Sequence, residues 1–217
     1  MSGHLNSWKW LERLGLICWI FTLLTLAITL TINARWLYSF SVDHLNVLDY
    51  VTFSKNQLMK NFDQLMHYLN LPWVDQLKMS DFPVSESGAV HFVDVKKLFL
   101  LNYGVLIVTI IPSIFYLRHL VKTKRLWTMQ RPFKIAFVIP LVIAAVGALN
   151  FNQFFVLFHE TFFSNDDWIF NPVTDPIINV LPEDFFMYCF ILFFVLLEVF
   201  FLVQIFIGKR SLKRDVL

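Results

Sequence analysis

Four blocks of nearly continuous apolar residues limit what this chain can fold into. They cover approximately residues 14–34, 98–117, 135–158 and 185–207. A helix needs about 20 apolar residues to cross the ~30 Å hydrocarbon core of a bilayer. Lipid cannot hydrogen bond to backbone amides, so spanning segments are helices or closed barrels, and continuous rather than alternating apolarity indicates helices. The blocks therefore predict an all-α membrane protein with four transmembrane helices, forming a single integral membrane domain over residues 1–217.

The composition agrees with a membrane protein. Hydrophobic residues make up 57% of the 217 residues and charged residues only 16%, whereas soluble domains carry about 25% charged residues.

Basic residues gather in three segments that contain almost no acids. These are Lys9 and Arg13 before the first block, the connector from Arg118 to Lys134, and the stretch from Lys209 to Arg214. Such segments are typical of the cytoplasmic side of a membrane, so we expect both termini to be cytoplasmic. The remaining connectors, residues 35–97 and 159–184, hold nearly all the acidic residues and are predicted to form a small extracytoplasmic cap.

The first part of this cap has the pattern of an amphipathic helix. Within residues 47–71 apolar side chains recur at helical spacing, and Pro72 cannot continue the helix. Residues 81–88 have a turn-like composition, from which we expect a short hairpin. The apolar positions are Leu58, Met59, Phe62, Leu65, Met66 and Leu69.

Two histidines occur at the same predicted depth although they are far apart in sequence. His91 precedes the second block and His159 ends the third, so both fall at the outer membrane boundary. Imidazoles titrate near pH 6.5 and can accept and return a proton at neutral pH. Asp94, three residues after His91, would lie close enough to orient its ring on a helix. An alternative is that each histidine is an ordinary interface residue.

Other polar and aromatic side chains surround these positions in sequence. Glu160 and Glu183 have a structural interpretation, in the case of Glu183 because an acid at the N-terminus of the fourth helix offsets the helix dipole. The aromatic residues form either an interface belt or the lining of an acyl-chain pocket. The candidate supporting residues are Asp94, Asn152, Phe158, Glu160, Phe163, Trp168 and Glu183.

Several enzyme classes are excluded by missing motifs. The sequence contains no Gly-Xaa-Ser-Xaa-Gly elbow, no His-Glu-Xaa-Xaa-His pair, no glycine-rich phosphate loop and no dinucleotide fingerprint. No zinc-type cluster occurs either, so we expect no metal, no cofactor and no nucleic-acid partner. Histidines without a convincing enzyme nucleophile suit a reaction in which the substrate supplies its own nucleophile.

Two runs carry a resemblance to a known family. Val90-His91-Phe92-Val93-Asp94-Val95-Lys96, and Phe158-His159-Glu160-Thr161-Phe162-Phe163 through to Leu181-Pro182-Glu183-Asp184-Phe185-Phe186, resemble the lipoprotein intramolecular transacylases of Gram-positive bacteria. The four-span pattern with a cap after the first span is also similar, so the resemblance covers nearly the whole chain.

The resemblance implies an acyl shift within one substrate molecule. The sn-2 acyl chain of a diacylglyceryl lipoprotein would move to the α-amine of its N-terminal cysteine, leaving a lyso-form lipoprotein in the bacterial cell membrane. Carried over by position, His91 and His159 are the catalytic pair, working at the outer leaflet among membrane lipids. The alternatives are a membrane lipid ester hydrolase, which would release free fatty acid, and a non-enzymatic membrane scaffold. The pattern specifies no oligomeric state.

Overall fold

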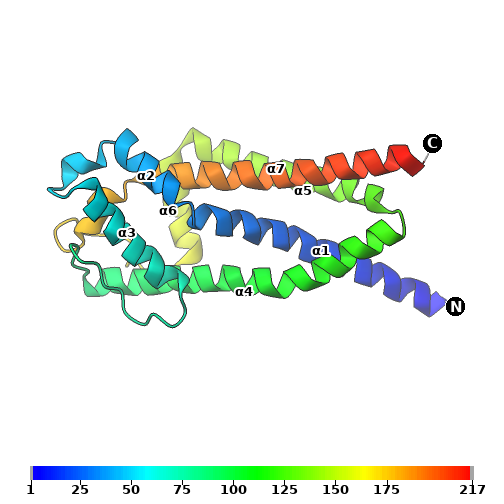
Figure 1. Cartoon of the computed structure of the whole chain (residues 1–217), viewed down its shortest axis with the longest axis horizontal. Coiled ribbons are helices and arrows are strands. Elements are labelled where there is room, and N and C mark those ends of the chain that lie inside the picture. Colours follow the sequence, from blue (N-terminus) through cyan, green and yellow to red (C-terminus); the bar gives the residue numbers. More distant parts are fainter. Residues whose placement is uncertain (1, 216–217) are drawn as a thin grey trace. The chain divides into compact units, whose positions relative to one another are not determined.

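Helices are the only regular secondary structure in the part of the chain that the structure, a computed structural model, describes (Figure 1). The backbone is described for residues 2–215 and the side chains for residues 10–212. The side chains of Lys9, Lys213 and Arg214, which belong to the predicted basic segments, therefore lie outside the described residues. The α-helices are α1 (Ser2–Ile32), α2 (Arg35–His44), α3 (Lys55–Asn70), α4 (Glu86–Lys122), α5 (Gln130–Leu149), α6 (Phe151–Phe162) and α7 (Glu183–Asp215). Three 3-10 helices are η1 (Val47–Tyr50), η2 (Leu126–Met129) and η3 (Pro176–Val180).

Four helical segments are long and apolar enough to cross a membrane, which confirms the prediction of four spans. They are Trp10–Ile32, Glu86–Lys122, Leu126–Leu149 and Glu183–Leu212. The chain divides into two compact units. We call residues 1–30, 102–145 and 192–217 the bundle unit, and residues 31–101 and 146–191 the cap unit.

The bundle unit has a thin core and an apolar exterior. Its buried core includes Leu23, Leu120, Phe133 and Phe201, whereas outward side chains such as Val108 remain 72% exposed. An exterior of this kind is stable when the surroundings are lipid rather than water.

The three basic segments come together in the bundle unit. Arg125, in the connector between α4 and α5, donates to both carboxylate oxygens of Glu12 on α1. At the start of α5, Gln130 lies so close to α7 that a Cβ added to Gly208 would be 2.8 Å from its side chain. The region from Arg125 to Gln130 therefore adjoins both the start of α1 and the last part of α7, which lie at the same end of the bundle unit in Figure 1.

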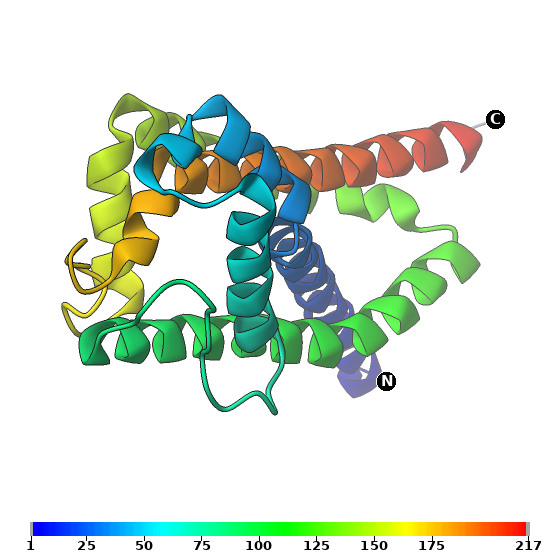
Figure 2. The same cartoon turned by 60° about the vertical axis from the view of Figure 1, so that its left-hand side comes forward.

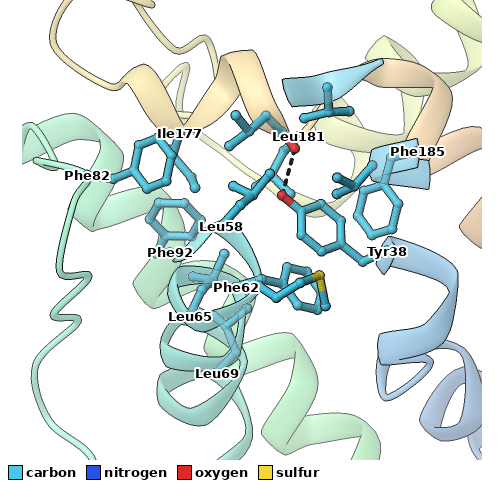
Figure 3. Close-up of a cluster of buried hydrophobic side chains, with 14 of the residues drawn as sticks. Tyr38, Leu58, Phe62, Leu65, Leu69, Phe82, Phe92, Ile177, Leu181 and Phe185 are labelled. Carbon is cyan, nitrogen blue, oxygen red and sulfur yellow. Dashed lines mark hydrogen bonds between the residues drawn. The ribbon is translucent and has the colours of Figure 1, made fainter. Parts of the chain in front are cut away.

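The cap unit is built on an aromatic core around α3 (Figure 3). The predicted amphipathic helix is confirmed, because α3 buries Leu58, Phe62, Leu65 and Leu69. A capping box between Ser54 and Gln57 begins the helix, which ends before Pro72 as expected. Tyr38 of α2 stacks on Phe62 at a centroid distance of 4.0 Å. The Tyr38 hydroxyl also donates to the Val180 carbonyl oxygen (3.0 Å).

The hairpin expected over residues 81–88 is wrong, because the described residues contain no strand and α4 already begins at Glu86. Side chains of α3 take the place of a strand partner for the preceding loop. The Asn61 side chain accepts a hydrogen bond from the Asp81 N–H (3.0 Å), and that of Gln64 accepts one from the Ser80 N–H (2.9 Å). A loop whose amides are bound in this way does not need a second strand.

The predicted third span over residues 135–158 is not one helix. The helix α5 ends at Leu149, and α6 begins at Phe151 after Asn150, whose side chain accepts a hydrogen bond from the Gln153 N–H (3.2 Å). An asparagine that caps the next helix adopts an extended conformation and interrupts the apolar run without a proline.

Candidate functional site

His91 lies in the second turn of α4 and is 7% exposed. Two aromatic rings of the connector after α6 meet it edge-on, Phe163 at a centroid distance of 4.8 Å and Phe170 at 5.4 Å. Its Nδ1 atom is buried and has no hydrogen-bond partner among the described residues. Leaving such an atom unpaired costs about 1–3 kcal/mol.

His159 lies in the last turn of α6 and is 8% exposed. Its Nδ1 atom is 2.8 Å from the Phe155 carbonyl oxygen. A carbonyl oxygen only accepts, so Nδ1 carries the proton and Nε2 has the free lone pair in the neutral ring. Burial lowers the pKa of His159 below its ordinary value, and the bond to the Phe155 carbonyl opposes this shift only in part. The ring is therefore a neutral base at pH 7.

The two predicted catalytic residues meet in the cap unit. The rings of His91 and His159 have centroids 5.8 Å apart, although the two residues are 68 positions apart in sequence. Phe163 contacts both rings, and Trp168 stacks on His159 at 4.7 Å. Phe158 meets His159 edge-on at 5.6 Å. Aromatic walls of this kind exclude water and strengthen polar interactions with a bound substrate.

The carboxylate of Asp94 accepts hydrogen bonds from Lys97 (2.8 Å) and from the side chain of Asn165 (3.1 Å). The residue thereby links α4 to the connector after α6. Its predicted role toward His91 stays a prediction. Asn165 was not predicted, because a single amide in a polar connector has no distinguishing sequence pattern.

The other polar candidates form no hydrogen bond with either histidine ring in the described part of the chain. Asn152 donates to Glu183 (2.9 Å), which ties the start of α6 to the first turn of α7. Glu183 lies where an acid offsets the helix dipole, in line with its structural interpretation. Glu160 is exposed beside His159.

Phe155 and Phe170 are the ring contacts that sequence reasoning did not single out. Phe155 packs on His159 at a centroid distance of 4.3 Å, and Phe170 packs on His91. Both belong to an aromatic-rich stretch in which an interface belt and a site lining have the same composition. The contact of Phe155 could have been predicted from its spacing to His159, since residues four apart on a helix share one face.

Fold and site together define a polytopic membrane protein that holds two buried imidazoles in an aromatic cluster. Comparison with protein families identifies it further: residues 13–186 match the model of the lipoprotein intramolecular transacylase Lit, and the chain belongs to this family. It is accordingly a lipoprotein intramolecular transacylase, an acyltransferase of the membrane.

Solved structures agree with this assignment. The chain is similar to the membrane-integral lipoprotein intramolecular transacylase Lit from Bacillus cereus, with 29% identity, a TM-score of 0.90 and 98% of each chain covered. Two variants of that protein, in which one histidine is replaced by arginine or by alanine, match with a TM-score of 0.82. The alignments cover 99% of this chain and 95% and 96% of those chains, respectively, at 29% identity. A comparison with curated protein sequences finds no significant match.

Proposed function

We propose that this transacylase moves the sn-2 acyl chain of a diacylglyceryl lipoprotein to the α-amine of the lipoprotein's N-terminal cysteine, with His91 and His159 as its catalytic pair. The product is a lyso-form lipoprotein that carries an N-acyl chain and one remaining ester. The observation that carries the proposal is the close approach of the two buried rings, 5.8 Å between centroids, with the His159 tautomer set by its bond to Phe155.

The proton moves in a closed cycle. As the amine nitrogen bonds to the ester carbonyl carbon, Nε2 of His159 takes the amine proton. As the bond from that carbon to the glyceryl oxygen breaks, the same imidazole returns the proton to the departing oxygen. Starting from the neutral amine, no proton is gained or lost in this cycle; the ammonium form must first release one proton to solvent.

His91 has a complementary role in this proposal. With its proton on Nδ1, the ring donates a hydrogen bond to the ester oxygen on which negative charge develops. This explains why a buried ring atom has no partner of its own in the described residues.

The chemistry requires little more than orientation of the substrate. The α-amine and the ester belong to one flexible molecule, and holding two reacting groups in line can lower a barrier by up to ~7–11 kcal/mol. An α-amine titrates near pH 7.7–8.0, so about a tenth of it is already the neutral nucleophile at pH 7.

The same proposal places the histidines at the outer leaflet and both termini in the cytoplasm. The support is the charge pattern. The three basic segments lie at one end of the bundle unit, where Arg125 donates to Glu12 and Gln130 packs beside Gly208. Basic segments of this kind stay in the cytoplasm.

The test replaces each histidine in cells that express a diacyl lipoprotein. We expect His91→Ala and His159→Ala to lower N-acylated product by at least ~10²-fold, the usual effect of removing a general acid or base. The N-terminal lipopeptide, read by mass spectrometry, reports the product. His67→Ala, an exposed histidine of α3 in the same unit, is the matched control and should retain normal product.

Labelled substrate and purified protein separate the proposal from its rivals. A transacylase leaves the label on the lipopeptide amine, whereas an ester hydrolase releases it as free fatty acid. Full product from either alanine variant would overturn the roles proposed for the pair.

A further inference from the structure

Asp175 is the most deeply buried carboxylate of the cap unit, at 1% exposure. One carboxylate oxygen accepts a hydrogen bond from the Ser85 backbone N–H (2.8 Å), and the other accepts one from the Thr174 hydroxyl (2.8 Å). Burial raises the pKa of Asp175, but the bonds from Ser85 and Thr174 outweigh it, and the net pKa lies below the ordinary value. The residue is thus an ionised group with defined partners.

Ser85 is the N-cap of α4, the helix that carries His91. Its hydroxyl accepts a hydrogen bond from the Gly88 N–H (3.0 Å). In a complete capping box, the third residue of the helix supplies a Glu or Gln side chain that accepts from the N-cap N–H. Here that third residue is Gly88, which has no side chain, and the acceptor for the Ser85 N–H is Asp175, 90 residues away in sequence.

The glycine makes room for this acceptor. A Cβ added to Gly88 would lie 2.4 Å from Oδ1 of Asp175 and 3.3 Å from Cε1 of Phe170. Both neighbours belong to the connector after α6, which runs beside the first turns of α4 (Figure 2). The space of the missing side chain is therefore filled by that connector.

His91 follows Gly88 by three residues and shares its helix face. Phe170, which fills part of the space at Gly88, also packs edge-on against His91. We propose that Asp175 is a positioning residue for His91: it completes the capping box of α4 from another segment, and so holds the His91 turn and the aromatic connector in one arrangement. This inference deepens the proposed function, on which its catalytic consequence rests.

The experiment uses the fact that the acceptor for the Ser85 N–H can come either from the connector after α6 or from α4 itself. Asp175→Ala removes the acceptor, and Gly88→Ala pushes it away. Asp175→Asn keeps an oxygen that accepts from Ser85. The double variant Gly88→Glu with Asp175→Ala supplies the acceptor from within α4, as an ordinary capping box does, and removes the collision.

Two controls match the single variants. Asp166→Ala removes an exposed carboxylate of the same connector. Gly104→Ala adds a methyl group to the same helix at a position where a Cβ would meet nothing within 4 Å. Both controls should behave like the unaltered protein.

One readout needs no catalytic activity. Diethyl pyrocarbonate carbethoxylates neutral imidazole, and mass spectrometry of the His91 peptide from membranes gives its rate. Loss of a cap acceptor opens the local structure, so we expect the rate at His91 to rise about tenfold in Asp175→Ala and Gly88→Ala. Asp175→Asn and the double variant should return to within about threefold of the unaltered rate.

The second readout is the transacylation rate. The two damaging variants should lower kcat about tenfold at similar KM, because the substrate still binds but meets a misplaced imidazole. The double variant should recover kcat. If Asp175 were needed only for general stability, an acceptor placed at Gly88 would not restore kcat. The proposal is overturned if His91 reactivity is the same in Asp175→Ala as in Asp166→Ala, or if the double variant is no better than Asp175→Ala.

Failure of the proposed chemistry would look different. If His91→Ala kept full activity while Asp175→Ala still exposed His91 to the reagent, the positioning role would stand and the catalytic role would fall. If Asp175→Ala did not accumulate in membranes, Gly88→Ala against Gly104→Ala, and the double variant, would still decide between the two outcomes.

Discussion

The bundle unit and the cap unit satisfy their buried polar groups in different ways. In the bundle, hydroxyls bond across helices: Thr22 contacts Thr109 (3.0 Å) and Ser113 (2.9 Å), and each of the three also bonds within its own helix. In the cap, side chains serve the backbone of loops, as Asn61 does for Asp81 and Asp175 for Ser85.

The physical reason is the different surroundings that the two units require. A helix satisfies its own backbone, so lipid-exposed helices need polar side chains only where they meet. Irregular connectors leave amides free, and each buried one needs an acceptor from elsewhere. The cap can therefore hold a defined site on connectors, while the bundle remains a set of packed helices.

The largest effect should come from the core of the cap. Leu58→Ala removes a fully buried side chain and should cost about 2–5 kcal/mol of stability, as large-to-small core changes do. Thermal unfolding of the detergent-purified protein measures the loss. Leu141→Ala, at a 50% exposed position of the bundle, is the comparison and should change stability little. Equal losses would mean that the cap has no densely packed core.

The second effect should be confined to the bundle. Val138→Arg places a charge at a 53% exposed position in the middle of α5 and should cost about 2.5–3.5 kcal/mol of insertion free energy. Val173→Arg, at an 86% exposed position of the cap, should be nearly neutral. The amount of membrane-inserted protein distinguishes them. Equal accumulation of both variants would contradict a lipid-facing surface at Val138.

The third prediction concerns pH and the cap alone. Since burial lowers the pKa of His159, the neutral ring persists to lower pH than a free imidazole, whose pKa is about 6.5. The rate of His159 carbethoxylation should therefore reach half its plateau below pH 6.5. By linkage, the unfolded chain binds this proton more readily, so stability should fall as pH drops through that region. A midpoint at or above 6.5 would contradict burial of the neutral ring.

The smallest effect should be the loss of one hydroxyl in the bundle. Thr22→Val removes the group shared by Thr109 and Ser113, and interhelical hydrogen bonds in membranes are worth only about 0.6 kcal/mol on average. We expect a small drop in the unfolding temperature. A loss as large as that of Leu58→Ala would mean that polar contacts, rather than packing, hold the bundle together.

Sequence patterns predicted the parts of the fold that depend on local apolar content. The four spans, the amphipathic character of α3 and its end before Pro72 all follow from spacing that a single segment carries. The candidate site was predicted from a shared depth: His91 and His159 each adjoin an apolar block, which placed them at one boundary before any contact was known.

Connector geometry could not be predicted in the same way. The partners of Asp94 are Lys97, which is near in sequence, and Asn165, which is not. The break between α5 and α6 arises because the Asn150 side chain caps a new helix. An asparagine within one continuous helix, facing a neighbouring helix, would have the same sequence signature, so the residue type alone does not predict the break. The absence of a hairpin before Glu86 follows from acceptors on α3 that no local pattern reveals.

By itself, then, the sequence determined that this chain forms four apolar helices, because helix formation in lipid depends on the residues within each segment, and it predicted two histidines at one boundary. Only the tertiary structure decided which groups meet. Asp175 could be placed on Ser85, and Phe170 against His91, only once the connector after α6 was packed beside the first turns of α4, because such contacts depend on the position of a distant segment rather than on local spacing.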